Sequence, residues 1–371
     1  MLLFKGPRDQ FLTPLQAVSG IVEKRHTLPI LSNVLIKKEG ESLTLMSTDI
    51  EMQISARTAT SGEDSVAVTV AARKLQDILR SLPESAEISL NIEERRLQLR
   101  AGKSRFNLQT LPAEDFPCMA QGGGESLEFS MPQRHFKRLL NLVQYAMAQQ
   151  DIRYYLNGLL LAVRQGEMRL VATDGHRLAF VSEENNAISD DENRVVEAIL
   201  PRKTVLEMSR QLADNDEEVN ISLSPTQARF TFGASEFVSK LIDGKFPDYE
   251  RVIPKEQDKL ISVERVVLQH SLQRAAILTN EKFRGVRIVL SPASLKMMST
   301  NAENEEAHEE IEVEYSGDEV DVGFNVNYLL DVLNNIGDEI MELRLSDGNS
   351  SALITLPDND KFKYVVMPMR I

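Results

Sequence analysis

Two hydrophobic patterns alternate along the chain, and they favour different secondary structures. In the first, apolar and polar residues take turns over short runs that Gly, Pro, Asn or Asp separate, which is typical of antiparallel β-strands. This pattern covers residues 86–112, 217–243 and 339–368. In the second, apolar residues recur every three or four positions, as in a helix with one buried face. Helices are expected in this way within 8–22, 70–82, 131–148, 199–212, 262–278 and 323–336.

These patterns recur three times in the same order: helix, strands, helix, strands. Thr48-Asp49, Thr173-Asp174 and Thr300-Asn301 mark the repeat at intervals of about 125 residues, and a strand-like apolar run precedes each pair. Breaks between the copies occur near the glycines at 122–124 and within 253–260. The sequence therefore predicts an α+β protein of three repeated domains. We expect these domains to cover residues 1–122, 126–254 and 255–371.

Composition narrows the classes of function. The 371 residues contain one cysteine, Cys118, which excludes a disulfide framework and a cysteine metal site within one chain. No apolar run approaches the roughly 18 residues of a membrane helix, and the amino terminus lacks the pattern of a signal peptide. We therefore expect a cytoplasmic protein with no membrane partner. The formal net charge of −14 argues against nucleic-acid binding, but net charge does not reveal how the charges are distributed.

The segment LVATDGHRLAFVS, residues 170–182, raises the question of an enzyme, because Asp174 and His176 stand two positions apart. A hydrolase would also need a nucleophile, a metal or an oxyanion site. No Gly-x-Ser-x-Gly, Walker, His-Glu-x-x-His or paired-cysteine motif occurs, and the other repeats replace His176 by Glu51 and Glu303. The sequence favours a structural turn with no catalytic residue, metal or cofactor. A hydrolase and a repeat scaffold that does not bind DNA are the alternatives.

The motifs QDIRYYLNG, VATDGHRLA, PRK, FPDY, NEKFRGVR and the C-terminal YVVMPMRI closely resemble those of the bacterial DNA polymerase III β subunits, the DNA sliding clamps. The resemblance runs in order over nearly the whole chain. It implies a head-to-tail homodimer whose six domains close into a ring around duplex DNA, with helices lining the hole. It also implies a processivity factor without enzymatic activity. The implied partners are the replicative DNA polymerase, the clamp loader, and repair and translesion polymerases.

A ring that slides must attract phosphates without reading bases, so the helix faces toward its hole should be basic. Lys and Arg gather on the expected second helices of the first and second repeats. The resemblance adds loop residues, including an adjacent tyrosine pair that can contact bases or backbone. On a strand, at most one tyrosine of the pair would be buried, because neighbouring residues face opposite ways. The predicted DNA-binding residues are Arg25, Arg73, Gln150, Arg153, Tyr154, Tyr155, Arg202 and Lys203.

The resemblance further implies that the acidic run of the third repeat meets a basic segment in the first repeat of a second copy. The acidic run lacks the spacing of a calcium loop. Such a contact joins two different surfaces, and two of them close the ring. Its apolar centre should carry affinity while opposite charges orient the join. The predicted interface residues are Lys74, Arg96, Lys103, Arg105, Phe106, Leu108, Ile277, Leu278, Glu303, Glu305, Glu306 and Glu309.

Finally, the resemblance implies a cleft between the second and third domains that binds short, extended peptides of the partners. Gly175 would let a partner's backbone approach closely, and Met367 and Met369 offer adaptable apolar surface. Asn349 stands where an apolar residue is expected, which would make one pocket of the cleft more polar. The predicted cleft residues are Leu156, Thr173, Gly175, His176, Arg177, Leu178, Pro247, Arg251, Val252, Tyr328, Asn349, Ser351, Val365, Met367, Pro368, Met369 and Arg370.

Overall fold

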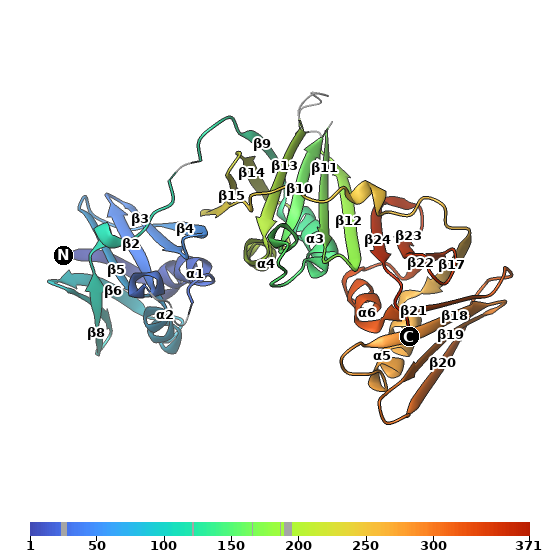
Figure 1. Cartoon of the computed structure of the whole chain (residues 1–371). Coiled ribbons are helices and arrows are strands. Elements are labelled where there is room, and N and C mark those ends of the chain that lie inside the picture. The colour runs from blue at the N-terminus through green and yellow to red at the C-terminus, as the bar shows by residue number, and fades with distance from the viewer. Residues whose placement is uncertain (24–27, 121, 165, 186, 189–194) are drawn as a thin grey trace. The chain divides into compact units, whose positions relative to one another are not determined.

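The computed structural model of the chain describes residues 1–23, 28–120, 122–164, 166–185, 187–188 and 195–371 (Figure 1). Its residues form two compact units. Unit 1 combines Met1–Phe136 with Leu206–Leu241, and unit 2 combines Lys137–Val205 with Ile242–Ile371. The division passes through the second repeat, so that each unit holds part of it.

Unit 1 contains an antiparallel sheet of 12 strands in the order β1-β6-β7-β8-β5-β2-β3-β4-β16-β15-β14-β9. Helices α1 (Arg8–Ser19) and α2 (Ala72–Ser81) pack against each other, and α1 also lies against β3 and β4. The strands are β1 (Leu2–Pro7), β2 (Asn33–Glu39), β3 (Ser42–Thr48), β4 (Met52–Ala59), β5 (Ser65–Ala71), β6 (Glu87–Glu93), β7 (Arg96–Ala101), β8 (Ser104–Leu111), β9 (Leu127–Pro132), β14 (Glu218–Leu223), β15 (Gln227–Phe232) and β16 (Ser235–Lys240).

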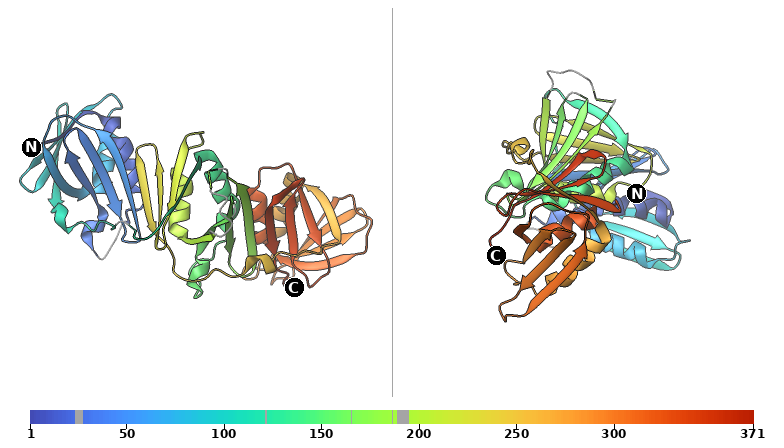
Figure 2. Two further views of the ribbon diagram at one scale, coloured as in Figure 1. Left: turned by 90° about the horizontal axis from the view of Figure 1, so that it is seen from above. Right: turned by 90° about the vertical axis from the view of Figure 1, so that its right-hand side faces the viewer.

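Unit 2 contains an eight-stranded sheet, β13-β10-β11-β12-β24-β23-β22-β17, and a four-stranded sheet, β20-β19-β18-β21. Strands of the larger sheet run side by side in both views of Figure 2. Helices α5 (Arg265–Ile277) and α6 (Val326–Asn335) pack against each other, and α5 lies against β19 and β20. The strands are β10 (Gly158–Arg164), β11 (Glu167–Thr173), β12 (Arg177–Glu184), β13 (Val195–Pro201), β17 (Lys259–Glu264), β18 (Gly285–Ser291), β19 (Ser294–Thr300), β20 (Glu306–Glu312), β21 (Val320–Asn325), β22 (Ile340–Leu345), β23 (Ala352–Leu356) and β24 (Asn359–Val366).

Three repeats of two helices on antiparallel strands confirm the predicted fold class. Helices α3 (Gln133–Val143) and α4 (Arg202–Gln211) belong to the second repeat. Helix α3 ends five residues before the expected 148, because Val143 leaves helical geometry with φ −128° and a 3-10 turn follows over Gln144–Ala146. No helix in the described parts of the chain is long and apolar enough to cross a membrane.

One type of strand pairing joins consecutive repeats. Strand β4 of the first repeat pairs with β16 of the second, with Ile54 opposite Phe237. Strand β12 of the second repeat pairs with β24 of the third, with Leu178 opposite Val365. The strands that correspond to these pairs at the two ends of the chain are β20 and β8. Strand β20 is the last strand of its sheet, and β8 meets β5 through Thr110 and Leu111 at its far end.

Candidate binding surfaces

The turn between β11 and β12 is held by the side chains of its own first two residues. The Thr173 hydroxyl donates to the Arg177 carbonyl at 2.6 Å and accepts from the Gly175 amide at 3.1 Å. The Asp174 carboxylate accepts from the amides of His176 at 2.9 Å and Arg177 at 3.0 Å. Asp and Thr make such local bonds in tight turns. The Asp174 carboxylate therefore shapes the turn through backbone amides, rather than orienting the His176 ring.

Equivalent bonds hold the corresponding turns of the other repeats. In the first repeat the Thr48 hydroxyl donates to the Met52 carbonyl at 2.8 Å, and Asp49 accepts from the Met52 amide at 2.8 Å. In the third repeat the Asn301 side-chain oxygen accepts from the Glu303 amide at 3.0 Å. Because one arrangement recurs with different neighbours, it supports the interpretation of the Thr-Asp pair as part of the scaffold.

Gly175 distinguishes the second turn from the first. Its φ of 89° lies in the left-handed region, and a Cβ on it would come 2.9 Å from guanidinium nitrogens of Arg153. Ile50 occupies this place in the first repeat with φ 79°, a strained conformation for a β-branched residue. The glycine lets Arg153 reach the Asp174 carbonyl at 3.1 Å and leaves the His176 side chain exposed beside an uncovered backbone.

Arg177 turns inward from this strand and is largely buried, with 9% of its side chain exposed. Its guanidinium pairs with Asp174 at 3.2 Å and with Asp331 of α6, and it donates to the Tyr145 carbonyl at 2.6 Å. The Tyr328 ring lies 4.5 Å from the guanidinium carbon. The sequence predicted a peptide contact at Arg177, whereas in this structure its charge is already paired and ties the turn to α6.

Electrostatics around Arg177 reflect this burial. Burial alone would lower the pKa of Arg177, but Tyr364 and the hydrogen bond to Asp331 raise it overall. Burial raises the pKa of Tyr145 and Tyr364, so both phenols stay neutral. The Tyr364 hydroxyl donates to the Tyr328 carbonyl at 2.9 Å. The cluster holds a permanent cation that neutral rings and two carboxylates surround.

The C-terminal segment lies beside the 173–178 turn. Strand β24 ends at Val366, and the Met367 amide then donates to the His176 carbonyl at 2.9 Å. The Met369 amide donates to the Gly323 carbonyl at 2.8 Å. The Met367 side chain is 44% exposed, so it shares an accessible surface with His176. The expectation that Pro368 interrupts a regular strand agrees with the end of β24 at Val366.

Several predicted cleft residues form the base of this region instead of its surface. Leu156, Leu178 and Val365 are at most 2% exposed and belong to one apolar cluster. Tyr155, Ile242, Tyr249 and Ile253, partly buried, pack against the same cluster. Thr173 is also buried. These side chains set the shape of the cleft but offer little area to a ligand in this conformation.

Other predicted cleft residues lie on the outside. Pro247 and Val252 are exposed, and Arg251 pairs with Asp248 at 2.8 Å. Asn349, in the turn between β22 and β23, is exposed and its amide donates to the Asp347 carboxylate at 2.8 Å. The Ser351 carbonyl accepts from Gln257 at 2.7 Å. In the described residues no hydrogen bond links Asn349 or Ser351 to the 173–178 turn. Arg370 is exposed.

The predicted DNA-binding loop adopts a 3-10 turn, not a strand. Tyr154 is 57% exposed, Tyr155 is half-buried, and their rings meet edge-on at 5.9 Å. Arg153 pairs with Asp151 at 2.9 Å, and this hydrogen bond lowers the pKa of Asp151 to about 2. Gln150 is exposed with φ 56°. Arg25 lies outside the described residues.

Basic residues on the second helices are partly engaged within the chain. Arg73 is exposed yet donates to the Val22 carbonyl at 2.9 Å. Arg202 donates to the Met147 carbonyl at 3.3 Å, and its burial, helped by nearby Arg177, lowers its pKa. Lys203 is exposed. These helices present positive charge, but less of it is free than their sequences suggest.

Strands β8 and β20 carry opposite charges. On β8, Arg105 is exposed while Phe106 and Leu108 are half-buried. The predicted interface residues Lys74, Arg96 and Lys103 are exposed as well. On β20, the exposed residues Glu306, His308, Glu310 and Glu312 alternate with half-buried ones, and the adjoining Ile277 is 75% exposed.

Glu309 on β20 is already paired within the chain. Its carboxylate accepts from Arg274 of α5 at 2.6 Å, and this bond lowers the pKa of Glu309. Sequence analysis missed Arg274, Tyr145 and Asp331, because each partner is distant in the chain. No local spacing in the sequence indicates such pairs. Among the described residues no three His, Cys, Asp or Glu side chains gather to hold a metal ion.

Comparisons with known proteins agree with this architecture. The family model described as the DNA polymerase III beta subunit, N-terminal domain, matches residues 2–120. The central-domain and C-terminal-domain models of the same subunit match residues 130–248 and 250–370. Together the three models cover nearly the whole chain in the order of the three repeats.

Full-length relatives and solved structures show the same likeness. The beta sliding clamp of Pseudomonas aeruginosa is 51% identical over 99% of this chain and 100% of its own length. That of Escherichia coli (strain K12) is 45% identical over 99% and 100%. A crystal structure of the DNA polymerase sliding clamp from Pseudomonas aeruginosa with ligand has a TM-score of 0.96 at 49% identity, covering 100% of both chains.

A more distant structure, titled Caulobacter crescentus pol III beta, keeps a TM-score of 0.92 at 37% identity over 100% of both chains. The fold thus persists where the sequences differ at most positions. By the matching domain models, the full-length relatives and the structures, this chain belongs to the DNA polymerase III beta subunit family, the bacterial DNA sliding clamps.

Proposed function

We propose that two copies of this chain close a ring around duplex DNA through β20 of one copy and β8 of the other. The observation that carries this proposal is the pairing that joins consecutive repeats. It uses β4 with β16 and β12 with β24. A third pairing of the same kind would join β20 to β8. In a ring of two copies, β20 of each copy would pair with β8 of the other.

The repeats also suggest a register for this closure. Glu306 pairs with Thr300 as Gln53 pairs with Thr48, so Glu306 of β20 corresponds to Gln53 of β4. Transferring the β4–β16 register then puts Phe106 of one copy opposite Ala307 of the other, and Ser104 opposite Glu309. In β4–β16 the corresponding pair is Ile54 and Phe237, and both side chains are fully buried. We expect Phe106 and Leu108 to become buried in the same way, against Ile277 and Leu278.

Charge complementarity supports the same join. Lys74, Arg96, Lys103 and Arg105 are exposed on the first repeat, and Glu303, Glu305 and Glu306 are exposed on the third. Opposite charges at the border of an apolar centre speed association and fix its orientation. Glu309 contributes less than the sequence suggested, since Arg274 already neutralises it.

DNA binding follows from the basic groups inside the ring. Phosphate contacts give sequence-independent attraction that salt weakens, which a sliding protein needs. We assign this role to Arg73, Arg202 and Lys203 on the helices and to Gln150, Arg153, Tyr154 and Tyr155 in the loop; Arg25 is assigned by resemblance alone.

The cleft of unit 2 binds short peptides of the replicative polymerase, the clamp loader, and repair and translesion polymerases. His176, Met367, Pro247, Val252 and Arg370 provide accessible contacts. Gly175, Pro368, Met369, Tyr328, Asn349, Ser351 and Arg251 border them, and Leu156, Thr173, Leu178 and Val365 lie beneath. Arg177 positions the turn. A flexible Met with apolar neighbours suits several related peptides.

We further propose domains over residues 1–122, 126–254 and 255–371, a cytoplasmic site of action and no enzymatic activity. The Asp174 carboxylate is bonded to two backbone amides and to Arg177, which argues against a role as acid or base. The protein should hydrolyse no substrate, and a His176→Ala variant should weaken peptide binding.

Retention on DNA of different topology tests the ring. Loaded onto nicked circular DNA, the protein should stay bound through gel filtration in salt that breaks phosphate contacts. Cutting the circle once should release it within the time of the experiment, because an encircling ring slides off the ends. Equal retention on circles and linear DNA would show simple electrostatic binding and contradict the proposal.

A further inference from the structure

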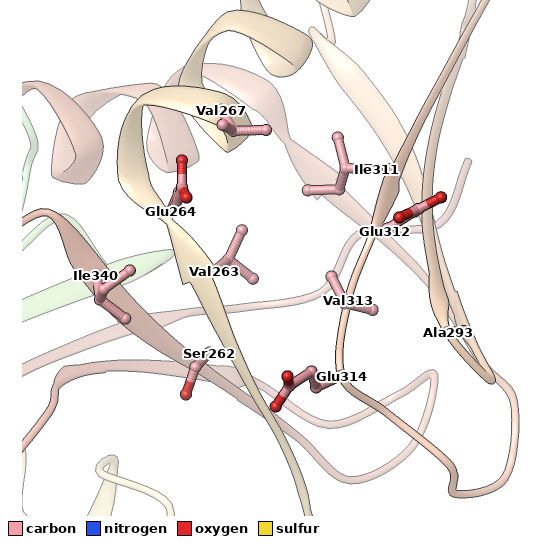
Figure 3. A pocket seen from close by; sticks show the side chains of 10 residues that line it. All are labelled: Ser262, Val263, Glu264, Val267, Ala293, Ile311, Glu312, Val313, Glu314 and Ile340. Carbon is pink, nitrogen blue, oxygen red and sulfur yellow. The ribbon is translucent and has the colours of Figure 1, made fainter.

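The third repeat contains a pocket of about 610 Å³ between β17, the start of α5 and the end of β20. Figure 3 shows Val263, Val267, Ile311 and Val313 directed toward one shared space, with Ile340 at its border. Glu264, Glu312 and Glu314 stand at the rim. We call this pocket, between the first strand, first helix and fourth strand of a repeat, the third seam.

The corresponding place in the first repeat, the first seam, is closed by hydrogen bonds. The Gln10 amide of α1 donates to the Ala59 carbonyl at 3.1 Å, and the Thr60 hydroxyl donates to the Leu3 carbonyl at 3.1 Å. The Lys38 ammonium donates to the carbonyls of Leu2 at 3.2 Å and Ser61 at 2.8 Å. These donors fasten the segment after β4 onto the open edge of β1.

Each of these donors is replaced by an apolar residue in the third seam. Strand pairing aligns Lys38 with Leu290 and Thr60 with Val313, and the helix starts align Gln10 with Val267. No hydrogen bond of the described residues fastens the segment after β20 to β17. The edge of β17 away from β22 therefore keeps main-chain donors and acceptors that a further strand could use.

Negative charge around this pocket is uncompensated. None of the carboxylates of Glu264, Glu312 and Glu314 forms an ion pair with a Lys or Arg in the described part of the chain. Glu312 and Glu314 are exposed, whereas Val313 between them is 8% exposed. Alternate positions thus offer an apolar contact inside and a carboxylate outside. An added strand whose apolar and charged side chains alternate can match this pattern.

A second copy of the chain would stop short of the pocket. In the first repeat the last backbone contact of the β15–β16 hairpin on β4 joins the Arg57 amide to the Ala234 carbonyl at 3.0 Å. The register proposed above carries this contact to Glu310, whereas the pocket begins at Ile311. This step alone rests on the proposed ring, and it leaves the pocket open after closure.

We propose that the third seam is a second peptide-binding site, for an extended segment of a partner protein in which Val or Ile alternates with Lys or Arg. The apolar side chains enter between Val263, Val267 and Val313, and the cationic ones meet the glutamates. The backbone pairs with the open edge of β17. In the eight-stranded sheet, β24, β23 and β22 lie between β17 and β12, the strand that follows the 173–178 turn, so ligands of the third seam do not share contacts with that turn.

Methyl NMR on the full-length dimer tests the site, because its walls are valine and isoleucine. The probe is the blocked hexapeptide Lys-Val-Arg-Val-Lys-Ile. We expect saturable shifts of Val263, Val267, Ile311, Val313 and Ile340, with no shift at the 173–178 turn. The scrambled peptide Val-Val-Ile-Lys-Arg-Lys has the same charge but no alternation, and it should bind at least tenfold more weakly.

Two variants locate the binding. Val267→Gln introduces the glutamine of the first seam at a half-exposed helix position and should weaken the probe at least tenfold. Replacing Glu264, Glu312 and Glu314 together by Gln should do the same. The matched control replaces Glu256, Glu281 and Glu319 by Gln, which removes three charges elsewhere on unit 2, and should leave affinity within twofold.

Any one of several results would overturn the proposal. Among them are no saturable shift at millimolar probe, equal binding of the scrambled peptide, and an unchanged affinity in Val267→Gln. Shifts of the same methyls when the dimer is diluted to monomers would identify a second copy as the occupant and also overturn it. Sedimentation of the same samples reports ring closure separately, so a failed ring and a failed pocket give different results.

Discussion

The first and third repeats place the same elements around the same seam, yet they finish it in opposite ways. In the first, Lys38, Gln10 and Thr60 close the seam, and β4 is covered by β16. In the third, Val267 and Val313 line a pocket, Leu290 stands in the place of Lys38, and β20 has an open edge. Because the fold is shared, these differences come from side chains and from the position of each repeat in the chain.

This contrast indicates that the third repeat, unlike the first, has surface available for binding other molecules. A seam that only has to be stable can use buried polar groups that are fully bonded. In the third repeat the outer edge of β20 has no neighbouring strand, and acidic residues there prevent unwanted sheet growth while favouring a basic partner. Each of the following substitutions alters a feature that differs between these two repeats.

The largest effect is expected at the open edge of the third repeat. The double variant Glu305→Lys/Glu306→Lys places two cations opposite the basic strand of the second copy. The dimer dissociation constant should rise roughly 10- to 100-fold, which is about 1.4 to 2.7 kcal/mol. Analytical ultracentrifugation at low salt measures it, and the effect should shrink in high salt because screening weakens exposed charges.

The control for this experiment is Glu281→Lys/Glu319→Lys, which changes the net charge equally away from β20. A compensating change, Lys103→Glu/Arg105→Glu, should restore part of the lost affinity when combined with the first variant. An unchanged dimer mass at low concentration, or no rescue, would contradict the assignment of β20 and β8 to the interface.

A smaller loss is expected when the first seam is made like the third. Lys38→Leu introduces the residue of the third repeat and leaves the carbonyls of Leu2 and Ser61 without their donor. Because Ser61 is exposed and Leu2 is half-buried, water can replace part of the lost bonding, and the cost should be about 1 kcal/mol. Calorimetry of the full chain should show a lower melting temperature for the transition of unit 1. An equal or higher melting temperature would mean that Lys38, 1% exposed, costs as much in burial as its bonds return.

Sequence patterns predicted the repeated helices and strands because these depend on local alternation. They also predicted that the Thr-Asp turns belong to the scaffold, since the three copies differ where an active site would be constant. The two seams could not be distinguished in this way. In the segment IKKEG, Lys38 follows another lysine and is expected on the surface. Its burial depends on the segment after β4, which folds back from 23 residues away.

The predicted cleft also depends on contacts between distant residues. The family resemblance assigns His176, Met367 and Arg177 to the peptide, and in this structure His176 and Met367 are exposed. The position of the Arg177 guanidinium depends on Asp331, 154 residues away, and on the rings of Tyr145 and Tyr328. A residue type and its neighbours indicate that a charge is present, but not which way a side chain at a turn will point.

A change of about 1 kcal/mol is expected at the turn before the fourth strand. Ile50 holds φ 79° in the first repeat, whereas Asn304 holds φ 62° in the longer turn of the third. Left-handed geometry strains a β-branched residue but suits Asn. Ile50→Gly should therefore raise the melting temperature, as relief of about 1 kcal/mol of strain predicts. Asn304→Gly should change it by far less, and equal shifts in both would contradict this explanation.

The smallest effect concerns the ion pair that only the third repeat has. Glu309 aligns with Ala56 of the first repeat, and the hydrogen bond from Arg274 lowers the pKa of Glu309 from its ordinary value. A lowered folded-state pKa means that the pair stabilises the protein above the unfolded pKa and is lost as pH falls through the folded one. Because Arg274 is 56% exposed, solvent screens the pair and its contribution to stability should be small.

Carboxyl NMR titration of the Arg274→Gln variant measures this pair directly. The Glu309 pKa should rise toward the ordinary value of a glutamate, while the dimer should dissociate no more readily at neutral pH than the unmodified protein. With its charge released from Arg274, Glu309 becomes available to the basic strand of the second copy. A tighter dimer in this variant would therefore show that the internal ion pair of the third repeat lowers the affinity at its open edge. The first repeat has Ala56 at this position and cannot form such a pair.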